Sequence, residues 1–201
     1  MLNIEFEPEK DALERITKAI GGVAYKAPTI LKDASNATGK YAMNQIFREV
    51  EKRYDYDDQA IKIKEAIKRK PATYANPRTI IHAKTYMNRL MNFHVTPRTI
   101  AISGARPDVY KGHVLKGTGD EPVIKNGFKG FIMRIQNKKS GTSHDELVAR
   151  ASKNRYPVKT LFAPSETHMA TYGFENSEEK IDKKLKENLQ KFTRKFIESR
   201  G

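Results

Sequence analysis

The spacing of the apolar residues changes twice along this chain of 201 residues, and that change constrains the fold more than any single motif. Up to about residue 70, apolar side chains recur every three or four residues, as in amphipathic helices. From Thr79 to about Phe162 the chain consists of short β-branched and aromatic runs separated by turn residues, which is typical of antiparallel strands. Helical spacing then returns at Ile181, Leu185, Leu189, Phe192 and Phe196.

These changes predict a helical part over residues 11–70, a sheet part over 79–163 and a C-terminal helix over 177–199. Helices, then strands, then a helix predict an α+β fold. We expect a single domain over 1–201, with the N-terminal helices and the C-terminal helix packed on a mainly antiparallel β-sheet.

Local signals refine the helical part and the loops. We expect a short helix from Asp11, a longer helix from about Pro28 to Arg53 that bends at Gly39, and a third helix that ends at Pro71. The acids of "YDYDD", residues 54–58, are expected to cap this third helix. Loops near 115–122 and 137–145 offer no apolar anchor, so we expect them to be mobile.

The chain is strongly basic, with a formal net charge of +14 and a pI near 9.8. The excess is spread over both halves, which indicates a folded basic body rather than a charged tail and favours a polyanionic partner. Lysine enrichment that only keeps the protein soluble is the alternative. The candidates to face a polyanion lie on the predicted third helix: Lys62, Lys64, Lys68, Arg69 and Lys70. Because cations at a helix C-terminus also suit the helix dipole, this run has a purely structural explanation too.

Composition limits the cellular setting. The chain has no cysteine, which excludes disulfides and thiolate metal sites and suits a reducing cytoplasm. No apolar run approaches the roughly 20 residues that span a bilayer, so we expect no membrane association. The N-terminal stretch is acidic and contains Pro8, unlike a secretory signal.

No sequence motif indicates catalysis. Glycines form no phosphate-binding loop, and the five histidines form no metal-binding motif, so we expect no cofactor, no metal and no enzyme activity. Ser143–Glu146 places a hydroxyl, an imidazole and two carboxylates together, but adjacent side chains on a strand point to opposite faces and cannot converge on one substrate atom. We therefore interpret this segment as a polar turn. The acids of residues 54–58 leave a metal-dependent nuclease as one alternative to a helix cap.

Residues 151–169, "ASKNRYPVKTLFAPSETHM", place aromatic residues next to prolines among basic and polar residues. Proline fixes the backbone and removes a hydrogen-bond donor, so each proline disfavours extension of a sheet. Aromatic rings and an arginine offer contact area and a forked donor. This pattern predicts a rigid docking ledge, made of Arg155, Tyr156, Pro157, Phe162 and Pro164. The alternative is a core strand with two turns marked by proline.

The same segment carries a resemblance to a known family. "VARASKNRYPVKTLFAPSETHM", preceded by "HDEL", resembles the C-terminal signature of the prophage minor tail protein Z family, the tail completion proteins of lambda-like long-tailed phages. "APTILKDASNATGKYAMNQIFREVEKRYD" followed by "IKEAI" and "LMNFHVTPR" resembles the first half of that family. The resemblance spans roughly residues 11–172.

The resemblance implies a structural virion protein without an active site. Such a protein completes the head-proximal end of the tail for head-tail joining and surrounds the DNA path as a ring, with a hexamer as the expected copy number. Its implied partners are copies of itself, tail terminator or tail tube proteins, head connector proteins and genomic DNA in the lumen. Its implied location is the tail or neck of the virion, and the host cytoplasm during assembly. A free protein that binds nucleic acid without sequence specificity remains the main alternative.

Overall fold

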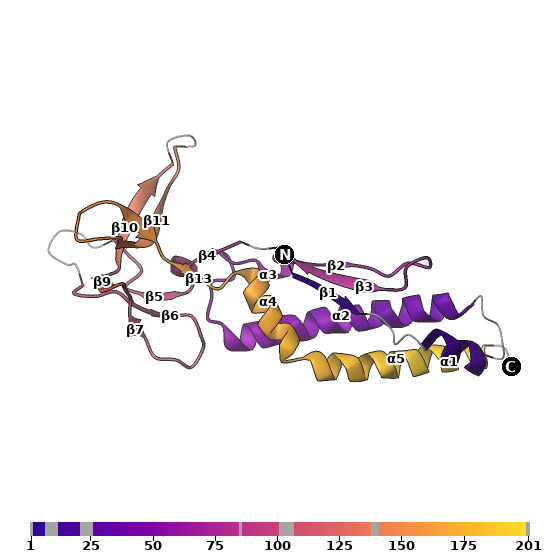
Figure 1. Cartoon of the computed structure of the whole chain (residues 1–201). Helices are drawn as coiled ribbons and strands as arrows, with labels where there is room; N and C mark the ends of the chain where they lie inside the picture. Colours follow the sequence, from indigo (N-terminus) through magenta and orange to yellow (C-terminus); the bar gives the residue numbers. More distant parts are fainter. Residues whose placement is uncertain are drawn as a thin grey trace. The chain divides into compact units, whose positions relative to one another are not determined.

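The computed structural model describes residues 2–6, 12–20, 26–84, 86–100, 107–137 and 141–199. The chain divides into two compact units (Figure 1). The first unit comprises residues 1–50, 63–85 and 166–201, and the second comprises 51–62 and 86–165. Among the described residues, no helix is both long enough and apolar enough to cross a membrane.

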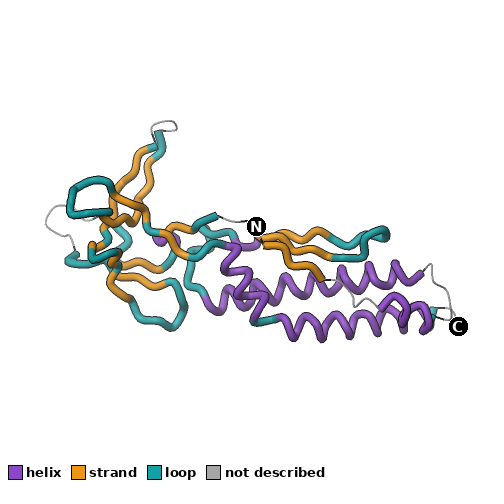
Figure 2. The backbone as a smooth tube through the Cα atoms, in the orientation of Figure 1, coloured by secondary structure: helices purple, strands orange, loops and turns teal. Residues whose placement is uncertain are grey.

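The first unit combines long helices with a small sheet (Figure 2). Its helices are α1 (Ala12–Ala19), most of α2 (Ala27–Arg53), the single turn α3 (Ile63–Ala66), α4 (Glu166–Glu175) and α5 (Glu178–Glu198). Its strands are β1 (Leu2–Phe6), β2 (Ile67–Lys70) and β3 (Thr79–Ala83), which form an antiparallel sheet in the order β1-β3-β2.

Two glycines allow the helices of the first unit to pack closely. At Gly39 of α2 a Cβ would collide with the side chain of Thr79 on β3, so the helix can approach the sheet only without one. At Gly173 of α4 a Cβ would lie 2.7 Å from the carbonyl oxygen of Ile46 on α2. An apolar cluster that includes Ile16, Ile30 and Leu31 joins α1 to α2, and Leu189, Phe192 and Phe196 of α5 pack against it.

The second unit consists of short antiparallel strands. The strands are β4 (Asn88–Arg89), β5 (His94–Thr96), β6 (Lys111–His113), β7 (Glu121–Pro122), β8 (Ile124–Lys125), β9 (Phe128–Lys129), β10 (Phe131–Gln136), β11 (Ser143–Arg150), β12 (Val158–Thr160) and β13 (Phe162–Ala163), and the 3-10 helix η2 spans Leu90–Asn92. They pair as β5-β6-β7, β10-β11-β12, β13-β4 and β8-β9. Their core contains Met91, Val95, Tyr110, Val123, Ile132, Leu147, Ala149 and Leu161.

The α+β class is confirmed, with helices and several antiparallel sheets. The sheet part differs from the prediction in two ways. The strands form several small sheets instead of one, and β1 and β2 lie outside residues 79–163. Ser143–Glu146 begins strand β11, so the predicted polar turn is wrong. The predicted mobile loops overlap β7 and β11, and residues 138–140 lie outside the described part of the chain.

The prediction of a third helix that ends at Pro71 is also wrong. Only Ile63–Ala66 is helical, and Lys68, Arg69 and Lys70 belong to strand β2. Asp57 caps no helix, because residues 58–60 form a turn and the next helix begins only at Ile63. Its carboxylate accepts a hydrogen bond from the backbone N–H of Gln59 in that turn. β2 forms because it pairs with β3, and the alternation of Ile67 and Arg69 against Lys68 and Lys70 suits that pairing. α2 continues as one helix through Gly39.

Candidate functional site

The side chains of the basic run, residues 62–70, point in different directions and have different contacts. Lys68 and Lys70 are exposed and project from the same side of β2, two residues apart. Arg69 projects from the other side, where its Nη1 donates to Asn36 Oδ1 on α2 at 2.9 Å. Lys62 and Lys64 are exposed just before β2. The five predicted residues therefore do not form one surface, because Arg69 ties β2 to the helix.

The predicted docking ledge lies on the surface of the second unit. Tyr156 is 62% exposed, and the Arg155 guanidinium lies 5.6 Å from its ring centroid. Pro157 is exposed as well, and its carbonyl accepts a hydrogen bond from the N–H of Ala151 at 3.1 Å. This geometry excludes the core-strand alternative for Tyr156 within the chain.

The second aromatic-proline pair lies on strand β13 and the loop that follows. Phe162 is 49% exposed although its backbone pairs with Arg89 of β4. Pro164 is half-buried, and its carbonyl accepts a hydrogen bond from Asn88 Nδ2 at 2.8 Å. Phe162 is thus exposed, as a docking role would require, whereas the carbonyl of Pro164 anchors the chain to Asn88 of β4.

The acids of residues 54–58 point to different partners. The carboxylate of Asp57 accepts a hydrogen bond from Arg98 Nη2 at 2.9 Å, and Asp58 is exposed. The hydrogen bonds from Gln59 and Arg98 lower the pKa of Asp57. The Tyr56 hydroxyl is buried, and this burial, with the charges of Asp58 and Glu51, raises its pKa to about 12. Among the described residues, the group of possible metal ligands that converges includes neither Asp57 nor Asp58, on which the nuclease alternative depends.

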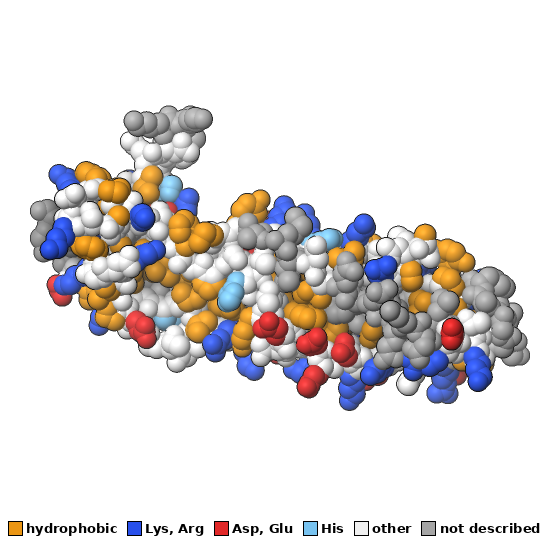
Figure 3. Space-filling view, viewed as in Figure 1, with side chains coloured by type: hydrophobic (Ala, Val, Ile, Leu, Met, Phe, Trp, Pro, Cys, Tyr) orange, Lys and Arg blue, Asp and Glu red, His pale blue; other side chains and the backbone are white. Residues whose placement is uncertain are grey.

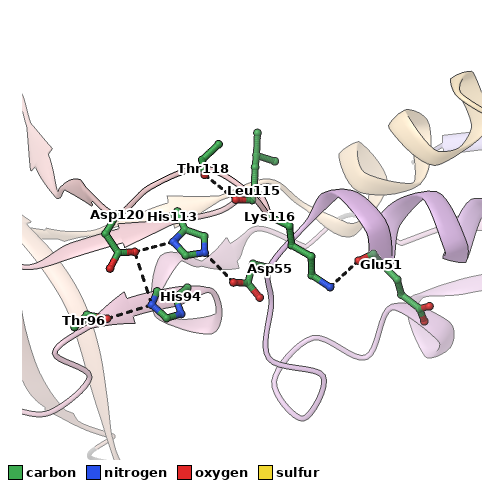
Figure 4. A network of polar contacts seen from close by, with 9 residues as sticks. All are labelled: Glu51, Asp55, His94, Thr96, His113, Leu115, Lys116, Thr118 and Asp120. Carbon is green, nitrogen blue, oxygen red and sulfur yellow. Dashed lines mark hydrogen bonds and ion pairs between the residues drawn. The ribbon is translucent and has the colours of Figure 1, made fainter.

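Asp55 instead joins a cluster that the sequence analysis missed (Figure 4). His94 of β5 and His113 of β6 are directly opposite each other in the strand register, and their rings stack 4.4 Å apart at 17°. Asp55 Oδ2 lies 2.8 Å from His113 Nε2, and Asp120 Oδ1 lies 2.7 Å from His113 Nδ1. We call these four residues the His-Asp cluster.

The backbone holds the His-Asp cluster in place. Asp55 N–H donates to the Val114 carbonyl at 2.9 Å, and Asp57 N–H donates to the Asn92 carbonyl at 2.9 Å. The segment that carries Asp55 is therefore hydrogen-bonded next to both strands that carry the histidines. Neighbouring contacts in Figure 4 extend this support, since Lys116 Nζ donates to the Glu51 carbonyl at 2.8 Å.

The two carboxylates act on His113 from opposite sides of its ring. Because carboxylate oxygens accept hydrogen bonds, both contacts are satisfied at once when both ring nitrogens carry a proton, so this arrangement favours the protonated imidazole. The hydrogen bond to Asp120, supported by the one to Asp55, raises the pKa of His113 above its ordinary value although partial burial opposes this. His94 is more accessible, with 47% of its side chain exposed, and its Nε2 lies 3.2 Å from Thr96 Oγ1.

A second buried charge lies on β11. The side chain of Glu146 is 2% exposed, and its Oε2 lies 3.2 Å from Arg89 Nε and 3.4 Å from His144 Nε2. Its other oxygen, Oε1, is buried without a hydrogen-bond partner in the described part of the chain. Burial raises the pKa of Glu146, and the charge of Arg89 opposes this only in part. Because Arg89 lies on β4 and Glu146 on β11, we assign this ion pair to the contact between these two strands.

No protein-family model, curated protein or solved structure matches this chain. A proposal for its function therefore depends on its own residues.

Proposed function

We propose that this chain is a structural protein of a phage virion that completes the head-proximal end of the tail for head-tail joining. In this proposal copies of the chain assemble into a ring, expected to be a hexamer, around the DNA path. The ring contacts tail terminator or tail tube proteins on one side and head connector proteins on the other. It resides in the tail or neck of the virion and assembles in the host cytoplasm.

The exposure of Tyr156 is the observation that carries this proposal. A solvent-exposed tyrosine next to a proline and an arginine offers a stiff apolar surface with a forked donor, and such residues are enriched at the centres of protein interfaces. The tyrosine lies in the "RYP" stretch on which the resemblance to the minor tail protein Z family rests. In an assembly, a neighbouring subunit would cover this exposed side chain, whereas in a monomeric protein it would stay in contact with water.

The charge of the molecule supports a DNA path through the assembly. The net charge is +14, and Figure 3 shows lysine and arginine side chains distributed over the visible face of each unit. Distributed lysines bind phosphates through charge and not through base contacts. Such a surface suits DNA that must slide past without being read.

A free protein that binds nucleic acid without sequence specificity is the second candidate, because the exposed lysines of β2 serve it equally well. We expect no enzyme activity from either candidate. The nuclease hypothesis is tested by magnesium-dependent DNA cleavage: cleavage that disappears in Asp57→Asn and Asp58→Asn would replace the structural role.

The assembly state of the purified protein separates the first two candidates. Native mass spectrometry and negative-stain electron microscopy should find a closed ring, at six times the chain mass of 22.9 kDa if it is a hexamer. A monomer at all concentrations that saturates DNA at low salt would instead support the free nucleic-acid-binding protein.

The ledge itself is tested by Tyr156→Ala. Truncation of an interface tyrosine often costs about 2 kcal/mol or more, roughly thirtyfold in affinity at each contact. Because a ring repeats the contact at each interface, assembly should fail sharply, and phage carrying the change should accumulate DNA-filled heads and separate tails. The unfolding midpoint should stay unchanged, since the side chain is exposed.

Tyr86→Ala is the matched control, because Tyr86 also belongs to the second unit and is 64% exposed but lies outside the ledge. It should leave assembly intact. Equal assembly defects in the two variants, or normal joining with Tyr156→Ala, would contradict the proposed role of the ledge.

A further inference from the structure

We propose that Asp55, His94 and His113 form a zinc-binding site in the second unit, with Asp120 as the carboxylate that orients His113. The inference is independent of the phage assignment, because it rests only on the geometry of the His-Asp cluster (Figure 4).

The first argument is the convergence of donor atoms from distant parts of the sequence. One ligand atom from each of Asp55, His94 and His113 lies within 4.8 Å of the other two. A zinc–nitrogen bond is about 2.0 Å long, so two ligand atoms on one tetrahedral ion lie roughly 3.3 Å apart. Asp55 Oδ2 and His113 Nε2, at 2.8 Å, need to separate only slightly to admit an ion.

The second argument is the position of Asp120. Histidines that bind zinc commonly donate the hydrogen of their other ring nitrogen to a carboxylate, which fixes the orientation of the ring. Asp120 accepts this hydrogen bond from His113 Nδ1 at 2.7 Å, on the side of the ring away from Asp55. The ion would take the place of the proton on Nε2, between His113 and Asp55.

The third argument concerns which parts must move. Asp55 and His113 are fixed by the backbone hydrogen bond between Asp55 N–H and the Val114 carbonyl. His94 must exchange contacts to reach the ion, because its Nε2 lies 3.2 Å from Thr96 Oγ1 and 3.7 Å from Asp120 Oδ1. With 47% of its side chain exposed, its ring has room to turn. Its exposure also leaves a fourth position open to water.

The donor set selects the class of metal. Two imidazoles and a carboxylate suit zinc and its neighbours among the late transition metals, whereas magnesium and calcium prefer sites made of oxygen atoms alone. The consequence for the protein is mechanical. A bound ion would clamp the segment that follows α2 to the β5-β6 pair, and thereby stabilise the second unit.

The test is calorimetric titration of the metal-stripped, tag-free full chain with zinc chloride. We expect saturable binding of one ion per chain, no saturable binding of magnesium, and an unfolding midpoint that rises with zinc. Asp55→Asn and His113→Gln should each weaken binding at least about tenfold, and Asp120→Asn by about 10- to 100-fold. His82→Gln is the control and should bind like the parent, because His82 lies in the first unit and contacts Asn3.

A second measurement needs no variant. In nitrogen-edited NMR spectra of the histidine rings of the parent protein, zinc should shift the His113 Nε2 and a His94 nitrogen and leave His82 in place. Absence of saturable zinc binding, parent-like affinity in Asp55→Asn and His113→Gln, or ring shifts confined to other histidines would each overturn the proposal. In those cases the cluster is a protonated His113 held between two carboxylates and nothing more.

Discussion

At the scale of single residues, burial of the Glu146 carboxylate costs desolvation free energy. It is the first of four consecutive buried residues on β11, and Arg89, its partner at 3.2 Å, is itself 46% exposed. An ion pair with one partner in water and one in the core recovers only part of the desolvation energy. This is the physical reason that the pKa of Glu146 is raised.

The raised pKa predicts a pH dependence of stability. The folded state favours the protonated carboxyl, so this contribution to stability is fully present below the ordinary pKa of 4.5 and is lost as pH rises through the higher pKa of the folded protein. Glu146→Gln mimics the protonated form and does not lose this contribution. The free energy of unfolding of the variant, relative to that of the parent, should therefore increase as pH rises from about 4.5 to 8. Urea unfolding at several pH values measures this difference.

Glu121→Gln, an exposed change in the same unit, should instead follow the parent at every pH. If the stability curves of Glu146→Gln and the parent stay parallel over this pH range, the buried carboxyl does not titrate with folding and the assignment is wrong.

At the scale of elements, the C-terminal helix α5 follows its apolar spacing closely. The predicted span of residues 177–199 contains the observed helix, Glu178–Glu198, because apolar residues repeat at helical spacing over its whole length. Burial along that stripe is uneven, however. Ile181 is fully buried, whereas Leu185 is half-buried and lines a groove between α1 and α5.

This uneven burial predicts a graded effect of truncation in α5. Ile181→Ala should lower the free energy of unfolding by about 2–5 kcal/mol, the usual cost of a large-to-small change in a core. Leu185→Ala should cost clearly less, because the parent side chain is already in partial contact with water. Equilibrium urea unfolding of both variants measures the difference, and equal losses would show that the groove is closed in solution.

The basic run of residues 62–70, which was predicted as a helix, shows where sequence reasoning fails. Ile61, Ile63 and Ile67 with intervening charges fit a helix about as well as a strand, so the local sequence does not decide between them. The decision comes from β3, whose residues Ile80–Ala83 supply the pairing partners of Ile67–Lys70. A long-range partner of this kind overrides local preference and leaves no trace in the spacing of apolar residues.

At the scale of the whole molecule, the α+β class follows from the order of the apolar patterns, but the His-Asp cluster does not. His94 and His113 meet only because the register of β5 and β6 places them opposite each other, and Asp55 reaches them through backbone hydrogen bonds. A one-residue change of register would turn one ring to the other face of the sheet. Sites assembled by register are therefore invisible to motif searches, whereas the exposed ledge at Tyr156 is encoded in consecutive residues.

The net charge of +14 carries the final prediction, which concerns DNA. Lys68 and Lys70 are exposed on the same side of edge strand β2, so they are the members of the basic run best placed to meet phosphates. Each lost phosphate contact should lower the slope of log affinity against log salt by roughly one. Lys68→Gln with Lys70→Gln should therefore reduce the slope by up to about two, measured by fluorescence anisotropy with duplex DNA at several salt concentrations.

Arg69→Gln is the informative comparison, because it removes one positive charge from the same strand but from the side that faces α2. The change removes the 2.9 Å hydrogen bond from Arg69 to Asn36 Oδ1, an oxygen that also accepts from the N–H of Ala72. We therefore expect lower stability and an almost unchanged slope of log affinity against log salt. A slope that falls equally in Arg69→Gln would mean that net charge alone governs binding. An unchanged slope in the double lysine variant would mean that these lysines serve to protect the exposed edge of the sheet from pairing with other chains.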